Sequence, residues 1–370
     1  MTFIEGVESS FGPIVVVFLA AAAVAFLLTP LVRRLVLRHG VVDRPDPRRV
    51  NVTDIPRSGG LAVAAAFLSV AAVFVYLNES AAWVAVPLTL SSPDLIALFV
   101  GGALAAGIGA IDDLFDLRAR WQLGGQLLLA VFAVGLGVGI EFIANPFGEG
   151  VIRFDGAFAV GFSVFWIAGM MNSINWIDGL DGLSSGVALI ACVTLGLISL
   201  TTQVGQPLIA VLCFALAGAL LGFLRWNFHP ATIFTGTSGV QFVGYTLAVL
   251  SILGSAKVAV ALLVLGVPIL DTFWIIVRRL MDGRSPFTPD RSHIHHRLLD
   301  LGLSHRNTVL VIYGICASLG AIALLLSQVT QLYAFLGVFL VSGLILFVSA
   351  RGAFRRPEEL EAEAYEPEHS

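Results

Sequence analysis

The sequence predicts an all-α, polytopic integral membrane protein with about eleven transmembrane helices, and three observations support this fold class. Of its 370 residues, 57% are apolar and only 12% are charged, whereas a soluble domain has about 25% charged residues. The mean hydropathy is +0.91. Apolar runs of about the 20 residues needed to cross a bilayer recur along nearly the whole chain, which leaves little sequence for a soluble domain.

Gly, Pro and charged residues separate these apolar runs. The first run follows an N-terminus with Glu5 and Glu8 in place of a basic region, so we expect a retained helix rather than a cleaved signal peptide. The eleven expected spans are residues 12–32, 59–77, 94–111, 124–142, 157–172, 184–201, 207–224, 238–254, 257–277, 308–327 and 331–349. Cys192, Cys213 and Cys316 lie inside spans, as packing residues rather than disulfide partners or zinc ligands.

The arginines predict how the chain is oriented. Of the 21 basic residues, 19 follow the first, third, seventh, ninth or eleventh span, and only Arg153 and Lys257 fall on the other side. Because cytoplasmic loops carry an excess of Lys and Arg, we expect the N-terminus outside and the C-terminus inside. Residues 1–350 would form one transmembrane domain in the plasma membrane. The acidic cytoplasmic tail 351–370 has no apolar period and is expected to be disordered.

Two acidic clusters lie at the predicted cytoplasmic ends of the third and fifth spans. They contain Asp112, Asp113, Asp116, Asn175, Asp178 and Asp181. If both segments stay helical, Asp116 lies one turn from the first two aspartates, and the other three residues stack on one face of their helix. Carboxylates beside apolar spans are costly unless they are paired, hydrated or bound to metal, so a functional site is expected. Hard oxygen ligands at this density suit Mg²⁺; the alternative is that the aspartates only cap helices.

The loop at residues 280–307 is the longest internal polar segment and contains His293, His295, His296 and Arg297. A cationic cradle for phosphate fits the acidic metal site, because Arg297 offers a planar fork and histidine can donate or shuttle a proton. Zinc binding is an alternative, although no cysteine lies nearby. Surface histidines without a function are another.

Two glycine-containing segments are expected on the same side. Residues 56–60 read Pro-Arg-Ser-Gly-Gly and open the second span, where the glycines permit close backbone approach. Residues 234–239 read Phe-Thr-Gly-Thr-Ser-Gly and open the eighth span, where free N–H groups could meet an anion.

Five segments between Asp43 and Leu303 carry a family resemblance. They are DDLFD at 112–116, NSINWIDGLDGLSSG at 172–186, NFHPATIFTG at 227–236, PILD at 268–271 and HIHHRL at 293–298. In this order and spacing they resemble the polyprenyl-phosphate N-acetylhexosamine-1-phosphate transferases of glycosyltransferase family 4. The form of the last segment resembles the branch that starts cell-envelope glycans with N-acetylglucosamine phosphate.

The resemblance implies transfer of a hexosamine phosphate from a UDP-sugar to polyprenyl (undecaprenyl) phosphate at the cytoplasmic face, with Mg²⁺ (or Mn²⁺) and release of UMP. It implies that Asp112 and Asp113 lie at the reacting phosphates, with His295 and Arg297 neutralising charge. The residues implied to hold the UDP-sugar are Asn175, Asp178, Asp181, Asn227, Phe234, His293 and His296, with Phe234 stacking on the base. The expected metal ligands are Asp112, Asp113, Asp178 and Asp181. Membrane lipid is an expected partner, nucleic acid is not, and a homo-oligomer is left open.

The sequence departs from the family pattern at two positions. Asn51 stands where the family usually has a histidine, and Thr237 stands where it has a metal-binding aspartate. A neutral hydroxyl therefore replaces a charged ligand. A non-catalytic homologue and a membrane transporter are the alternative functions, and a covalent phosphoaspartate at Asp113 is the alternative mechanism.

Overall fold

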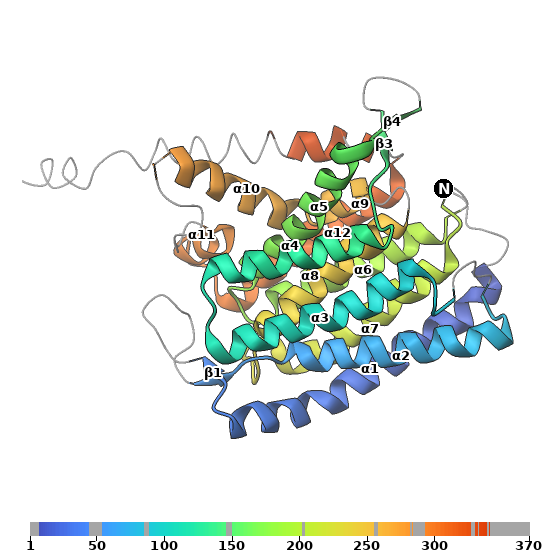
Figure 1. The fold of residues 1–370 in the computed structure, drawn as a ribbon. Coiled ribbons are helices and arrows are strands. Elements are labelled where there is room, and N and C mark those ends of the chain that lie inside the picture. The colour runs from blue at the N-terminus through green and yellow to red at the C-terminus, as the bar shows by residue number, and fades with distance from the viewer. Residues whose placement is uncertain are drawn as a thin grey trace, which may run out of the picture.

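The structure is a computed structural model, and it describes residues 7–43, 54–84, 89–145, 150–201, 204–254, 258–281, 283, 293–326, 330–331, 333–338 and 340. The long helices lie side by side in one bundle (Figure 1). They are α1 Val7–Arg38, α2 Gly60–Ala81, α3 Pro93–Phe115, α4 Ala119–Gly135, α5 Gly156–Ile177, α6 Leu183–Ser199, α7 Pro207–Asn227, α8 Gly236–Leu253 and α12 His305–Leu325. The shorter helices are α9 Val258–Val264, α10 Gly266–Met281 and α11 Ile294–Asp300.

The all-α polytopic class predicted from hydropathy is confirmed. Within the described residues, 7 helices are long and apolar enough to cross a membrane, and Leu183–Ser199 is a shorter apolar helix. Ten of the expected spans fall on helical segments. Most of the eleventh, residues 331–349, and the whole acidic tail lie outside the described residues. The number of spans and the sidedness of the termini therefore stay predictions.

The expected ninth span, residues 257–277, is two helices rather than one. α9 ends at Val264 and α10 begins at Gly266. Pro268 accounts for the division, because proline has no N–H to donate to the carbonyl four residues earlier, at Val264. The break lets α10 follow its own direction toward the end of the bundle that carries α11 (Figure 1).

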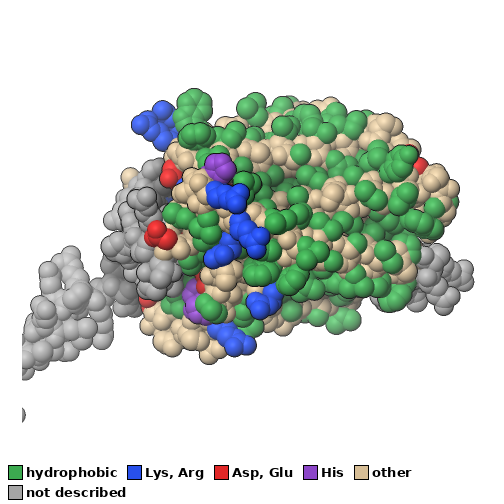
Figure 2. All heavy atoms as spheres, turned by 90° about the horizontal axis from the view of Figure 1, so that it is seen from below, with side chains coloured by type: hydrophobic (Ala, Val, Ile, Leu, Met, Phe, Trp, Pro, Cys, Tyr) green, Lys and Arg blue, Asp and Glu red, His purple; other side chains and the backbone are tan. Residues whose placement is uncertain are grey.

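Two short hairpins mark opposite ends of the bundle. β1, Val42–Asp43, pairs antiparallel with β2, Ile55–Pro56. β3, Phe142–Ala144, pairs antiparallel with β4, Val151–Arg153. In Figure 1 the first hairpin and α11 lie at the left end, whereas the second hairpin extends from the other end. Lys, Arg and His side chains gather toward the left end of the face shown in Figure 2, and hydrophobic side chains cover most of the remainder.

Glycine allows the helices around this charged end to touch backbone to backbone. A Cβ on Gly60 would lie 1.9 Å from the Cα of Gly239, and one on Gly109 would lie 2.5 Å from the Cα of Ser238. α2, α3 and the N-terminus of α8 therefore meet with no side chain between them. This close packing fixes the segments that carry the acidic and glycine-containing motifs.

Gly109→Ala is accordingly expected to lower the melting temperature of the detergent-solubilised protein, because the new methyl group overlaps the backbone of residues 237–238. Overpacking of this kind costs about 1–3 kcal/mol. Gly107→Ala is the matched control on the same helix, since a Cβ there meets nothing within 4 Å. It should be neutral or slightly stabilising because alanine favours helix. Equal melting temperatures for the two variants would contradict the backbone contact.

Candidate active site

A pocket of about 510 Å³ opens at the charged end of the bundle. It is bordered by the ends of α5 and α7, the start of α8, and the loops before α2 and α12. The residues that line it are Asp43, Ile55, Arg57, Asp113, Asn175, Asp178, Gly179, Leu180, Asp181, Asn227, His229, Pro230, Ala231, Phe234, Thr235, Gly236, Thr237, His296 and His305. Segments far apart in the sequence therefore meet here.

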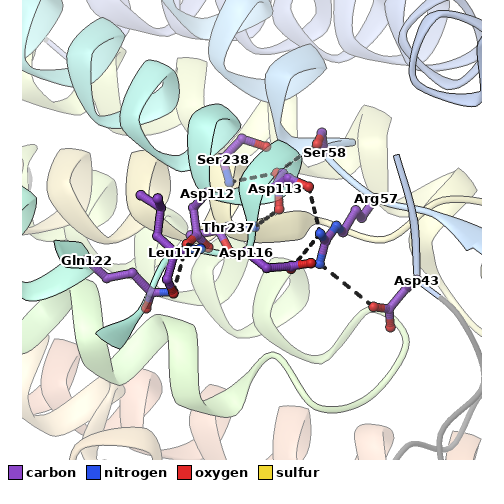
Figure 3. A network of polar contacts seen from close by, with 10 residues as sticks. All are labelled: Asp43, Arg57, Ser58, Asp112, Asp113, Asp116, Leu117, Gln122, Thr237 and Ser238. Atoms are coloured by element: carbon purple, nitrogen blue, oxygen red, sulfur yellow. Dashed lines mark hydrogen bonds and ion pairs between the residues drawn. The ribbon is translucent and has the colours of Figure 1, made fainter. Parts of the chain in front are cut away.

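The Asp113 carboxylate lines the pocket and accepts three hydrogen bonds (Figure 3). Its Oδ1 accepts the N–H of Thr237 at 2.8 Å. Its Oδ2 accepts the N–H of Ser238 at 3.1 Å and the hydroxyl of Ser58 at 2.7 Å. Because the two N–H groups belong to the first turn of α8, the carboxylate satisfies otherwise free helix donors and lies at the positive end of the helix dipole. These bonds fix one orientation of Asp113.

The loop before α2 owes its position to backbone pairing with the loop before α8. Phe234 donates its N–H to the Pro56 carbonyl at 2.8 Å, and Gly59 returns a bond to the Phe234 carbonyl at 2.9 Å. Between these bonds Ser58 adopts a left-handed backbone with φ 72°. A non-glycine residue rarely adopts this conformation, and here it accompanies the hydrogen bond from Ser58 to Asp113.

Asp112 and Asp116 do not share the environment of Asp113. The Oδ1 of Asp112 accepts the Leu117 N–H at 3.0 Å and the Gln122 amide at 2.9 Å, and Asp112 does not line the pocket. α3 ends at Phe115, and Asp116 is its left-handed cap with φ 48°. The helix therefore ends just before Asp116 rather than continuing through it, which was the condition for the predicted spacing of the three aspartates. The chain turns here because the Leu117 N–H bonds to a side chain instead of continuing the helix.

Helix α5 ends at Ile177, so the segment does not stay helical through Asp181, the condition under which Asn175, Asp178 and Asp181 would stack on one helix face. The turn nevertheless leaves all three residues in the pocket lining. Asp178 accepts a hydrogen bond from the Ser184 hydroxyl. Burial, together with the negative charges of Asp113 and Asp181, raises the pKa of Asp178 to about 7.

Asp181 lies between two histidines. Its Oδ2 is 2.7 Å from Nδ1 of His229 and accepts the Ala231 N–H at 3.0 Å, while its own N–H donates to Nε2 of His305 at 2.9 Å. These ligand atoms are close enough for a metal ion. However, the two imidazole rings stack at 4.3 Å and 20°, so their in-plane lone pairs cannot meet at one ion. The arrangement favours a hydrogen-bonded cluster that fixes the loop at residues 178–182.

The histidine loop contributes less to the pocket than expected. Asp271 on α10 pairs with Nδ1 of His293 at 2.7 Å and accepts the Ile294 N–H at 2.9 Å, which anchors the start of α11. His295 is 1% exposed and packs against Gly179. Burial and the neighbouring histidines lower the pKa of His295 to about 2, so its ring is neutral at physiological pH.

Within the described part of this loop, His296 and His305 line the pocket, and neither His295 nor Arg297 does. The neutralisation of phosphate by those two residues therefore stays a prediction, and the structure adds that neither of them borders this cavity. His295 instead packs against the turn at residues 178–182, where Gly179 leaves room for its ring.

Asn227, Phe234 and Thr237 all lie in the pocket lining. Asn227 is 2% exposed, accepts the Ser185 hydroxyl at 2.9 Å and donates to the Ile233 carbonyl at 3.1 Å. It therefore stabilises the turn that presents Phe234. Asn51, the other departure from the family pattern, lies outside the described residues.

Several residues at the pocket were not singled out from the sequence, and four of them are Arg57, Ser58, His229 and His305. Ser58 reaches the pocket through Asp113, and the others line it directly. Arg57 and Ser58 belong to a segment that was noted for its glycines, and His229 belongs to one that was noted for the family resemblance. His305 was counted only as part of the polar loop. Polarity beside a motif was the available signal, and contacts across 48 to 124 residues of sequence could not be predicted from it.

Comparison with known proteins adds the following. The sequence model of glycosyl transferase family 4 matches residues 95–255. The chain is 37% identical over 344 residues to the "Probable undecaprenyl-phosphate N-acetylglucosaminyl 1-phosphate transferase" of Bacillus subtilis (strain 168), covering 90% of each protein. It is 36% identical over 358 residues to the "Decaprenyl-phosphate N-acetylglucosaminephosphotransferase" of Mycobacterium tuberculosis (strain ATCC 25618 / H37Rv), covering 89% of this chain and 87% of the relative. A Yersinia pestis "Undecaprenyl-phosphate alpha-N-acetylglucosaminyl 1-phosphate transferase" is 26% identical over 352 residues.

Proposed function

The chain belongs to glycosyl transferase family 4, and from this premise we propose that it transfers N-acetylglucosamine-1-phosphate from a UDP-sugar to a polyprenyl phosphate. The observation that carries the proposal is the similarity, over about 90% of the chain, to relatives named for this transfer. The pocket that contains Asp113, Asp178 and Phe234 is the proposed place of reaction. UMP would be the second product, and the reaction would begin a cell-envelope glycan.

The proposed chemistry is a single displacement at phosphorus. A phosphate monoester has a second pKa of about 6, so the lipid phosphate is largely a dianion at neutral pH and is already nucleophilic. One of its oxygens attacks the sugar-linked phosphorus, the bond to the bridging pyrophosphate oxygen breaks, and UMP leaves with that oxygen. Most of the catalytic work is positioning and charge neutralisation.

The chain's own groups have separate tasks in this scheme. Asp113 orients the lipid phosphate or removes its residual proton. Phe234 offers a ring for the uracil to stack on, and the turn at residues 178–182 encloses the donor. A covalent phosphoaspartate would require Asp113 to attack instead. The three hydrogen bonds that hold its oxygens favour an orienting role.

The carboxylates of the pocket fit Mg²⁺. Asp113 and Asp178 line the same cavity. Burial and the like charge of Asp113 disfavour the ionised form of Asp178, and a bound cation would reduce this cost. Mg²⁺ is usually held by one or two carboxylates together with substrate phosphates, so these two residues would hold it. The bound ion would supply charge neutralisation to the pyrophosphate. Asp112 faces away from the cavity, and Asp181 is engaged with His229.

Thr237→Asp is expected to shift the Mg²⁺ activation curve to lower concentration, because a carboxylate would replace a hydroxyl in the pocket lining. A tenfold shift corresponds to about 1.4 kcal/mol of added metal affinity. Thr237→Asn is the matched control, since it adds a similar volume without charge. Unchanged Mg²⁺ dependence in the aspartate variant would show that the metal is held away from residue 237.

The function itself is tested with purified protein, polyprenyl phosphate, Mg²⁺ and a panel of UDP-sugars, with UMP measured. Release of UMP with UDP-N-acetylglucosamine, and formation of the lipid-linked sugar phosphate, are expected. Thr237 favours one other candidate, a non-catalytic homologue that binds substrates. It predicts UDP-sugar binding without UMP release at any Mg²⁺ concentration.

We place this pocket at the cytoplasmic face because most arginines follow the spans that end there. Single cysteines test this in a background without the three native cysteines, which are all buried. Leu301→Cys near the pocket end, at a site 77% exposed, should resist a membrane-impermeant maleimide in intact cells. Val151→Cys in the opposite hairpin, at a site 47% exposed, should be labelled. The reverse pattern would overturn the orientation.

A further inference from the structure

We infer that Arg57 binds a phosphate oxygen of the substrates in this pocket. The inference rests on the proposed function, which requires the site to accept a pyrophosphate and a phosphate monoester together. Four aspartates line the cavity, and among the described lining residues Arg57 is the sole lysine or arginine. So acidic a cavity would repel both substrates unless cations offset its charge, and Arg57 is a cation fixed in the chain that would act beside the proposed Mg²⁺.

Arg57 is held where it can serve this purpose (Figure 3). Its Nη2 donates to the Asp113 carbonyl at 2.7 Å and to Oδ1 of Asp116 at 2.7 Å. Its Nη1 is 4.0 Å from Oδ1 of Asp43, at the edge of ion-pair range. One nitrogen of the fork is therefore engaged closely and the other only loosely. The Nε is buried and has no hydrogen-bond partner among the described residues, although such groups are usually satisfied.

The position of Arg57 beside Asp113 follows from the chain's packing. The guanidinium contacts the backbone of the residue whose carboxylate faces the cavity, so it lies next to the group proposed to orient the lipid phosphate. A guanidinium can bind phosphate through two parallel N–H groups, which fixes geometry as well as charge. Arg57 would thus supply a phosphate contact from the cavity lining, to which His295 and Arg297 do not belong.

A purely structural Arg57 is the competing interpretation, because its bonds to Asp116 and to the Asp113 carbonyl also fasten the first hairpin to the end of α3. The two interpretations predict different behaviour for Asp116, whose side chain is 78% exposed. Removing its charge breaks the ion pair but leaves the guanidinium in the pocket. Removing the guanidinium itself takes away both the ion pair and the phosphate contact.

The test compares Arg57→Gln, Arg57→Lys and the matched control Asp116→Asn. UMP release gives kcat and KM for each substrate, and calorimetry gives the affinities for UDP and for polyprenyl phosphate. Thermal unfolding monitors the fold. Arg57→Gln is expected to lower kcat/KM about 100-fold, as for loss of one charge-stabilising donor. Arg57→Lys should retain part of the activity, and Asp116→Asn should stay within about threefold of the parent because exposed ion pairs contribute little.

A higher KM for polyprenyl phosphate would assign the contact to the acceptor, and a higher KM for the UDP-sugar would assign it to the donor. Equal losses in Arg57→Gln and Asp116→Asn, or parental kinetics in Arg57→Gln, would overturn the inference. If Arg57→Gln does not fold, parental kinetics in Arg57→Lys together with a loss in Asp116→Asn would overturn it. If the parent releases no UMP, the proposed function fails. The binding affinities then test the inference about Arg57. Weaker binding of UDP or of polyprenyl phosphate in the Arg57 variants alone would support it, and unchanged binding would refute it.

Discussion

Asp113→Asn is expected to lower turnover at least about 100-fold while the helices still form. The loss follows because the amide is neutral and can neither accept a proton nor pair with a cation in the pocket, and a positioned acid–base group contributes about 10²–10⁴-fold. The substitution also turns an amide NH₂ toward one of the donors from Ser58, Thr237 or Ser238. That mismatch should destabilise the protein by about 1–3 kcal/mol.

Asp112→Asn is the matched control for this prediction. Asn can still accept the hydrogen bonds that Asp112 receives from Leu117 and Gln122, so its loss of turnover should be much smaller. UMP release by both variants, with melting temperatures measured beside it, separates the pocket carboxylate from the capping one. Equal losses would show that the working site reaches Asp112, as the sequence alone led us to expect. Parental turnover by Asp113→Asn would remove this pocket as the place of reaction.

The bundle could be predicted from the sequence because hydropathy acts locally. About twenty consecutive apolar residues form a helix in a bilayer whatever their neighbours are, since every backbone polar group must be satisfied within the segment. The starts of α3 and α7 agree with the predicted spans because they too depend on a local signal. Proline stands in the first turn of each helix. The division at residue 265 was missed because the apolar run continues through it.

The helix ends and the details of the site depend on contacts between distant segments. α3 ends before Asp116, and the Asp116 carboxylate accepts a hydrogen bond from Arg57, which lies 59 residues earlier in the chain. The turn at Asp181 depends on His305, 124 residues away. Asp113 and Asp178 were singled out because they stand in dense polar clusters, and Asn227 was singled out through the family resemblance; all three line the pocket. The motifs did not reveal that His295 is buried against Gly179 and does not line the pocket, because every histidine in a cluster looks equally available to substrate from sequence alone.

Asp178→Asn is expected to have two opposite effects. It should stabilise the metal-free protein, and it should nearly abolish turnover. Burial and the charges of Asp113 and Asp181 raise the pKa of Asp178 from 3.8 in the unfolded chain to about 7. Between these values the unfolded chain is ionised while the folded protein holds the proton. Stability is therefore lost as the pH rises from about 4 to 7, and the loss is complete above the folded pKa.

A shift of this size corresponds to at most about 4 kcal/mol, because each pKa unit is 1.36 kcal/mol. Asparagine cannot ionise, and it can still accept the hydrogen bond from Ser184. In EDTA the melting temperature of Asp178→Asn should therefore exceed that of the parent at pH 8, and the difference should shrink as the pH falls toward 4. Adding Mg²⁺ should raise the melting temperature of the parent more than that of the variant, because only the parent presents both carboxylates. Turnover should fall at least about 100-fold in the variant. A variant less stable than the parent at pH 8, or one with the parent's response to Mg²⁺, would show that Asp178 pays no ionisation cost in this pocket and holds no metal there.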